Sequence, residues 1–60
     1  MSMREILYET VRIGSLVKVT AIDAATGLEA AVVGRAGSDP SALRSLALRK
    51  LTYRLARNAP

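Results

Sequence analysis

The sequence contains no cysteine and no histidine. Their absence excludes disulfide bonds, thiolate chemistry and the usual zinc ligands. A metal site would need several of the five acidic residues to converge, and these residues are scattered along the chain. We therefore predict no metal and no cofactor.

Phenylalanine and tryptophan are also absent, and tyrosine occurs twice. The core must therefore be built from Leu, Val, Ile and Ala, in a chain of 60 residues. A chain this short buries only about 60% of the surface that its unfolded form exposes. Domains of this size usually need a disulfide, a metal or an oligomeric partner. We predict one small domain over residues 1–60 that is stabilised by self-association.

Long apolar runs are missing as well. No run approaches the roughly 18 residues of a membrane-spanning helix. The N-terminal "MSMREILYET" has an acidic residue where a signal peptide would carry its apolar segment. We expect a cytoplasmic protein without membrane contact.

Three segments have the alternation and the β-branched content of strands, at about residues 4–13, 16–22 and 28–34. Between the second and third lies "DAATG", where Asp23 can start a turn and Gly27 can adopt positive φ. Pairing Asp23 with Leu28 would place Ala21 opposite Ala30 and continue one apolar face across both strands.

The first turn allows two registers. A two-residue loop of Gly14 and Ser15 would set Arg12 opposite Val17, whereas a longer loop aligns Ile13 with Val17. We prefer the longer loop because it continues the apolar face, and a slip of one residue would move every side chain to the other face. The opposite face would then carry Ile6, Tyr8, Ile22, Ala31 and Val33 among Thr10, Arg12, Lys18, Thr20 and Glu29.

A helix is predicted over about residues 40–57. Asp39 can cap its N-terminus and Pro40 suits the first helical position. Steps of about 100° gather a main apolar arc that should pack on the sheet. This arc consists of Leu43, Ala47, Leu48, Leu51 and Leu55. The predicted fold is α+β, a three-stranded antiparallel β-meander followed by one C-terminal α-helix packed on the sheet.

Two apolar surfaces remain without a partner in this arrangement. Leu46 and Tyr53 form a second stripe on the helix, and the outer sheet face is more apolar than a solvated face needs to be. Exposed patches of this kind usually mark association sites. We predict a non-enzymatic interaction domain, homodimeric or bound to a protein partner, with an interface drawn from Leu46, Tyr53, Ile6, Tyr8 and Ile22.

Nucleic-acid binding is the alternative. The formal net charge is +4, and basic side chains can contact phosphates. The candidate contacts are Lys50, Arg54 and Arg57 on the helix, with Arg12 and Lys18 on the sheet. The same helix positions also suit the helix dipole as plain solvated charges.

Enzyme motifs are poorly supported. Ser15 and Lys18 match an S-x-x-K pattern, but in a turn and a strand rather than at a helix N-terminus. Glu5 and Glu9 would lie about 13 Å apart on a strand, too far for a glycosidase pair. Gly34 and Gly37 precede a helix but lack the P-loop spacing and its lysine.

The run "VKVTAIDAATGLEAAVVGRAG", followed by a helix containing "ALRKLTYRLAR", resembles a group of small alphaproteobacterial proteins of unknown function. Their shared pattern is a "VTAID-x-x-TG-x-E" hairpin and a C-terminal "A-x-x-KL" helix. The resemblance covers about residues 4–57 and implies the meander and the helix. It implies no activity, cofactor or functional residue.

Overall fold

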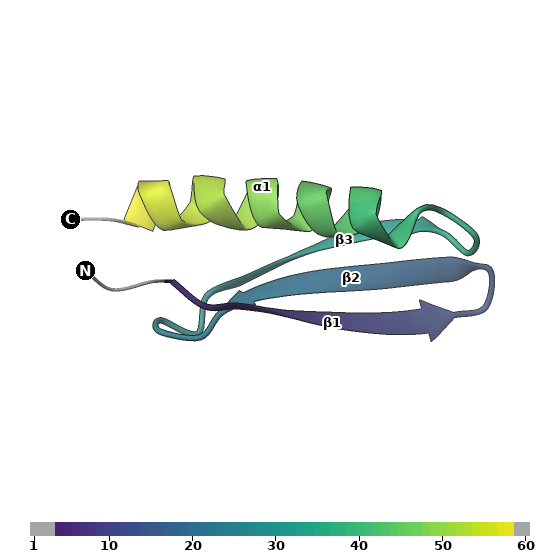
Figure 1. The fold of residues 1–60 in the computed structure, drawn as a ribbon, viewed down its shortest axis with the longest axis horizontal. Coiled ribbons are helices and arrows are strands. Elements are labelled where there is room, and N and C mark those ends of the chain that lie inside the picture. The colour runs from purple at the N-terminus through teal and green to yellow at the C-terminus, as the bar shows by residue number, and fades with distance from the viewer. Residues whose placement is uncertain (1–3, 59–60) are drawn as a thin grey trace.

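The computed structural model describes residues 4–58 and has the predicted α+β fold. Strands β1 (Ile6–Ile13), β2 (Leu16–Asp23) and β3 (Glu29–Arg35) form one antiparallel sheet in the order β1-β2-β3, and helix α1 (Pro40–Asn58) follows (Figure 1). Residues 1–3 and 59–60 of the predicted domain lie outside the described residues.

The molecule has two layers, with α1 packed on β3 and β2 while β1 lies farthest from the helix (Figure 1). Small side chains let the two layers approach closely. The buried core consists of Val19, Ala21, Ala30, Leu43, Ala47 and Leu51. Because the helix is narrower than the sheet, it leaves most of β1 uncovered, and seven of the eight β1 residues are exposed.

The start of α1 follows from Asp39 and Pro40. The Ser41 amide donates a hydrogen bond to Asp39 Oδ1 at 3.0 Å, and the Leu43 amide donates to the Asp39 carbonyl oxygen at 3.2 Å. The Ser41 contact satisfies an amide that the first helical turn cannot pair internally, and the Leu43 contact is the first hydrogen bond of the helix itself. The helix then continues without Gly or Pro to Asn58. Within residues 4–58, no helical segment has the length and the apolar content that are needed to cross a membrane.

The second hairpin has the predicted register. Ala21 pairs with Ala30 and Val19 with Val32, and the Asp23 amide donates to the Leu28 carbonyl oxygen at 2.8 Å. Gly27 adopts a φ of 79° at the end of the turn, a region that favours glycine. The alternation of apolar residues in β2 and β3 and the residues of the turn between them both predict this register.

The predicted register of the first hairpin is wrong. Arg12 pairs with Val17 and Ile13 with Leu16, so the loop contains two residues, Gly14 and Ser15. Gly14 has a φ of 61°, as a type II′ turn requires at its first central position. Because α1 does not cover β1, burial does not select the register of this strand, and the turn geometry decides it.

The two faces of β1 are consequently the reverse of those predicted. Ile6 and Tyr8 lie on the face that carries the helix, opposite Asp23 and Ala21. The outer face receives Leu7, Val11 and Ile13 from β1 instead.

Candidate interaction surfaces

The outer face of the sheet is the largest group of exposed apolar side chains that the structure describes. On this face Leu7 pairs with Ile22, Val11 with Lys18, and Ile13 with Leu16. Ile13 and Val33 remain 60% and 61% exposed. The apolar residues of this outer sheet face are Leu7, Val11, Ile13, Leu16, Ile22, Ala31 and Val33, and its charged residues are Glu9, Lys18, Glu29 and Arg35.

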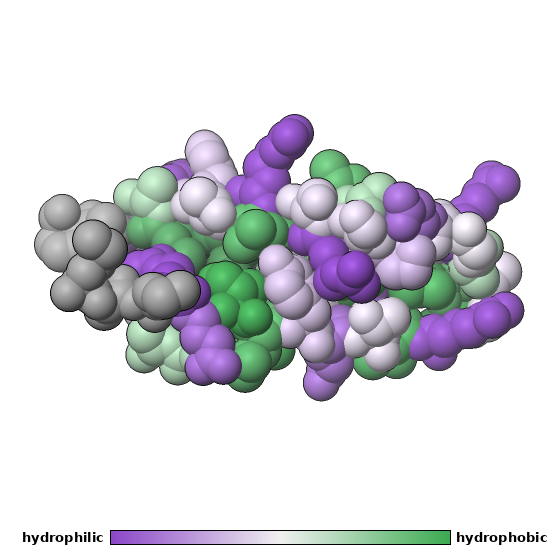
Figure 2. All heavy atoms as spheres, viewed as in Figure 1, coloured by the Kyte–Doolittle hydropathy of each residue, from purple (hydrophilic) through white to green (hydrophobic). Residues whose placement is uncertain are grey.

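Among the predicted interface residues, Ile22 alone occupies the outer sheet face. Ile6 packs against the core cluster and is partly buried. Tyr8 lies on the same side of β1 and is 39% exposed. Figure 2 shows apolar surface exposed among charged side chains along the molecule.

Leu46 and Tyr53 are exposed on α1 as expected, at 49% and 63%. The Tyr53 ring already has a neighbour, because the Arg57 guanidinium carbon lies 5.7 Å from its centroid, within cation–π range. Leu48, predicted to be in the core, is 37% exposed. It faces the side of the helix toward β1, where the sheet offers no full cover.

Two of the predicted nucleic-acid contacts have an intramolecular role. Lys50 Nζ donates a hydrogen bond to the Ala31 carbonyl oxygen at 2.8 Å, and Arg54 Nη1 donates to the Glu29 carbonyl oxygen at 3.0 Å. Both carbonyl groups belong to the edge of β3 that faces away from β2. The helix therefore covers one edge of the sheet with two cationic side chains.

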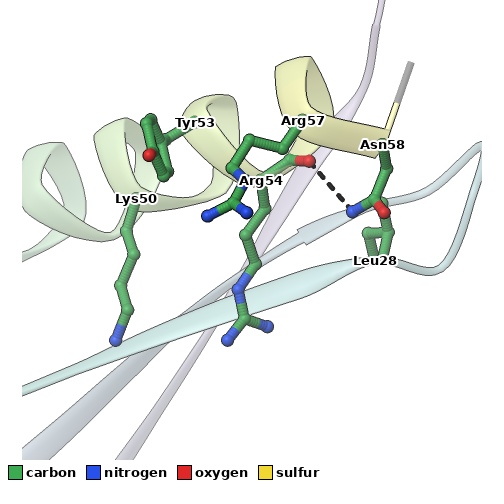
Figure 3. A pocket seen from close by; sticks show the side chains of 6 residues that line it. All are labelled: Leu28, Lys50, Tyr53, Arg54, Arg57 and Asn58. Carbon is green, nitrogen blue, oxygen red and sulfur yellow. Dashed lines mark hydrogen bonds between the residues drawn. The ribbon is translucent and has the colours of Figure 1, made fainter. Parts of the chain in front are cut away.

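The five candidate nucleic-acid contacts do not form one surface. Lys50, Arg54 and Arg57 line a shallow depression together with Tyr53, Leu28 and Asn58 (Figure 3). Arg12 lies near the turn between β1 and β2, where its Nε donates to the Gly14 carbonyl oxygen at 3.1 Å. Lys18 lies on the outer sheet face. The helix cations alone make a compact positive site.

Asp23 is the fully buried ionisable side chain of the described residues. Its Oδ2 accepts hydrogen bonds from the Thr26 hydroxyl at 2.6 Å and the Thr26 amide at 3.2 Å. Arg4 Nε lies 3.7 Å from Oδ1. Oδ1 has no hydrogen-bond partner within residues 4–58. The contacts of this carboxylate organise the second turn.

Gly34, one of the two glycines compared with the P-loop pattern, lies within β3 beneath the helix. A Cβ atom at this position would lie 2.7 Å from Leu43 Cδ2, so the glycine permits close packing of α1 on β3. No cluster of potential metal ligands occurs in the described part of the chain.

The placement of Leu7, Val11 and Ile13 on the outer sheet face was not predicted, because the predicted register of the first hairpin reverses the two faces of β1. The signal that could have found it is the dipeptide Gly14–Ser15, since glycine at the first position of a two-residue loop is typical of type II′ hairpins.

Comparison with known proteins gives one family match. A family model described as a domain of unknown function, DUF6898, matches residues 3–58. Neither the curated proteins nor the solved structures gave a match.

Proposed function

We propose that this chain, which belongs to this family of unknown function, is a non-enzymatic interaction domain that works as a homodimer through the β1 side of its sheet. The observation that carries the proposal is the exposure of β1. Seven of its eight residues are exposed, and apolar side chains occupy both of its faces.

The physical reason is the cost of leaving apolar area in water, about 25 cal/mol per Å². Leu7, Val11 and Ile13 are 42–60% exposed on the outer face, and Tyr8 is 39% exposed on the other. A domain of 60 residues has little core with which to offset this cost. Association of two copies removes the exposed area from water.

The second stripe on the helix is the weaker candidate for the same contact. Leu46 and Tyr53 are seven residues apart, and Arg57 approaches the Tyr53 ring within the chain. The sheet offers a continuous surface, whereas this stripe offers two separated side chains. We therefore place the dimer contact on the sheet.

Sedimentation velocity between about 1 and about 100 µM tests the proposal. We expect a dimer for the natural sequence. Ile13→Glu should raise the dimer dissociation constant by at least about tenfold, because it places a charge on the outer sheet face. Leu46→Glu, the matched change on the helix, should leave the constant unchanged.

Circular dichroism of both variants checks that they remain folded. A monomer at every concentration would overturn the proposed self-association. Weakening by Leu46→Glu, with no effect of Ile13→Glu, would move the interface to the helix and contradict the proposed surface.

A second candidate function, nucleic-acid binding, is favoured by the depression in Figure 3. Three basic side chains and Tyr53 line it, a combination suited to phosphates and a stacked base. Lys50 and Arg54 also bond to β3, whereas Arg57 contacts the Tyr53 ring on its own helix. Arg57 is therefore the residue whose change least disturbs the packing of α1 on the sheet.

Titration with mixed-sequence single-stranded DNA and RNA, beginning at about 50 mM salt, tests this candidate. Arg57→Ala should weaken binding and lower the salt slope by about one. Arg44→Ala, on the first half of the same helix, is the matched control. No binding at about 50 mM salt would exclude this function.

A further inference from the structure

The two edges of the sheet differ. Antiparallel pairing turns the backbone groups of alternate residues toward a given neighbour. In β1 the backbone amides and carbonyls of the odd-numbered residues point toward β2. This follows from Glu5, an odd-numbered residue whose carbonyl oxygen accepts a hydrogen bond from the Ala24 amide. The amides and carbonyls of Ile6, Tyr8, Thr10 and Arg12 therefore face outward.

The outward edge of β3 is covered by side chains of α1. Its outward carbonyl oxygens at Glu29 and Ala31 accept hydrogen bonds from Arg54 and Lys50. Charged side chains over an edge are a common protection against pairing with another chain. Among the residues that the structure describes, no side chain donates a hydrogen bond to an outward carbonyl of β1 itself. Arg12 Nε donates to the Gly14 carbonyl oxygen, which lies in the turn beyond the strand, and β1 contains neither proline nor glycine.

We propose that two copies pair antiparallel through their β1 edges, about a two-fold axis at Thr10, to form one six-stranded sheet. This inference rests on the proposed homodimer and specifies its geometry. The occupant of the edge is a second copy because the β1 sequence complements itself in one register.

The outward residues of one copy must meet outward residues of the other, which restricts the possible registers. Two registers pair seven residues of each strand, and further shifts pair five or fewer. In one of the two, Glu9 lies directly opposite Glu9 of the second copy. Like charges directly opposite one another destabilise an antiparallel pair.

The other register is centred on Thr10. It places Glu9 opposite Val11 of the second copy, Leu7 opposite Ile13, and Tyr8 opposite Arg12. Leu7 and Ile13 form an apolar pair on the outer sheet face, while Arg12 can lie over the Tyr8 ring on the helix side. Thr10 exchanges two backbone hydrogen bonds with Thr10 of the second copy. Tyr8 of each copy does the same with Arg12 of the other copy.

The helix does not obstruct this arrangement, because α1 packs on β3 and β2 and leaves the β1 side open (Figure 1). The pairing over residues 7–13 also extends the outer sheet face across both copies.

Amide hydrogen exchange measured at protein concentrations below and above the dimer dissociation constant tests the geometry. We expect exchange at Tyr8, Thr10 and Arg12 to slow at least about tenfold at the higher concentration, because these amides gain partners in the dimer. Exchange at Val33 and Arg35, on the outward side of β3, is the internal control and should not depend on concentration.

Single-cysteine variants provide a second measurement, since the natural sequence has no cysteine. Thr10→Cys should oxidise to a disulfide dimer, because the Cα atoms of such a pair lie about 5.5 Å apart. Glu9→Cys should form a disulfide only in the rejected register. Ser45→Cys, on the exposed side of α1, controls for random collision.

The outcomes separate the two proposals. Slowed exchange at the three amides with preferential oxidation of Thr10→Cys supports the β1 pairing. A dimer in sedimentation whose Tyr8, Thr10 and Arg12 amides exchange equally at all concentrations overturns it and leaves the proposed function standing. Preferential oxidation of Glu9→Cys overturns the Thr10 register, and a monomer overturns both proposals.

Discussion

The ammonium group of Lys50 donates a hydrogen bond to the backbone carbonyl oxygen of Ala31, 2.8 Å away. One turn further along α1, Arg54 Nη1 makes the equivalent contact with the Glu29 carbonyl oxygen, 3.0 Å away. Figure 3 shows both side chains extending from the helix toward the sheet. The basic side of the helix thus covers the edge of the strand on which the helix packs. In the sequence, Lys50 and Arg54 suggest contacts with nucleic acid. In the fold, both side chains bond to backbone carbonyl groups of β3.

Removing these two contacts should weaken the fold and open the β3 edge. For Lys50→Met combined with Arg54→Met, we expect the free energy of unfolding to fall by about 1–3 kcal/mol, since each of the two hydrogen bonds contributes about 0.5–1.5 kcal/mol. Light scattering should also detect larger oligomers, because the second edge becomes available for pairing. Arg44→Met combined with Arg49→Met removes the same charge elsewhere on α1. If this control aggregates equally, net charge rather than edge cover is responsible.

Leu51 and Leu48 should differ sharply on truncation, although both belong to the predicted apolar arc. Leu51 is fully buried and Leu48 is 37% exposed. We expect Leu51→Ala to cost about 2–5 kcal/mol and Leu48→Ala less than about 1 kcal/mol. Urea unfolding of the two variants measures the difference. Equal losses would contradict the described position of α1 over the sheet.

Asp23 should stabilise the second hairpin through its contacts with Thr26. We expect Asp23→Ala to lower the free energy of unfolding by about 2–3 kcal/mol, because the Thr26 amide and hydroxyl lose the charged acceptor that fixes the turn. Asp23→Asn keeps an acceptor oxygen and should lose less. Thermal unfolding of both variants at one pH checks the order, and a smaller loss for Asp23→Ala would refute the role of the hydrogen bonds.

Gly34 should be required because of Leu43. Gly34→Ala places a methyl group where Leu43 Cδ2 now lies, and the resulting overpacking should cost about 1–2 kcal/mol. In a Leu43→Ala background the same change should cost much less. Denaturant unfolding of the two single variants and the double variant gives this coupling. Additive losses would mean that Gly34 acts through the backbone alone.

Much of this fold is readable from short-range signals in the sequence. Asp39 and Pro40 start the helix, and Asp23 with Gly27 forms the second turn, because capping and positive φ are local requirements. The register of β2 with β3 was also predictable, since both strands lie under the helix and burial allows one alternation. These elements are specified by neighbouring residues and by a buried face together.

The first hairpin shows where the reasoning from periodicity fails. An apolar match favoured aligning Ile13 with Val17, but that match matters only if the helix covers β1. Since it does not, Gly14 and its turn geometry set the register, and Ile6 exchanges faces with Leu7. The exposure of Leu48 has the same origin.

By itself, the sequence determined three strands, a capped helix, an aliphatic core and the absence of disulfides, because each follows from residue type or spacing. The tertiary structure alone decided which strand the helix leaves uncovered and what the helix cations contact. Both depend on the position of α1 across the sheet, which brings Lys50 and Arg54 to the β3 edge and leaves the backbone of β1 exposed. Long-range placement of this kind has no counterpart in local sequence.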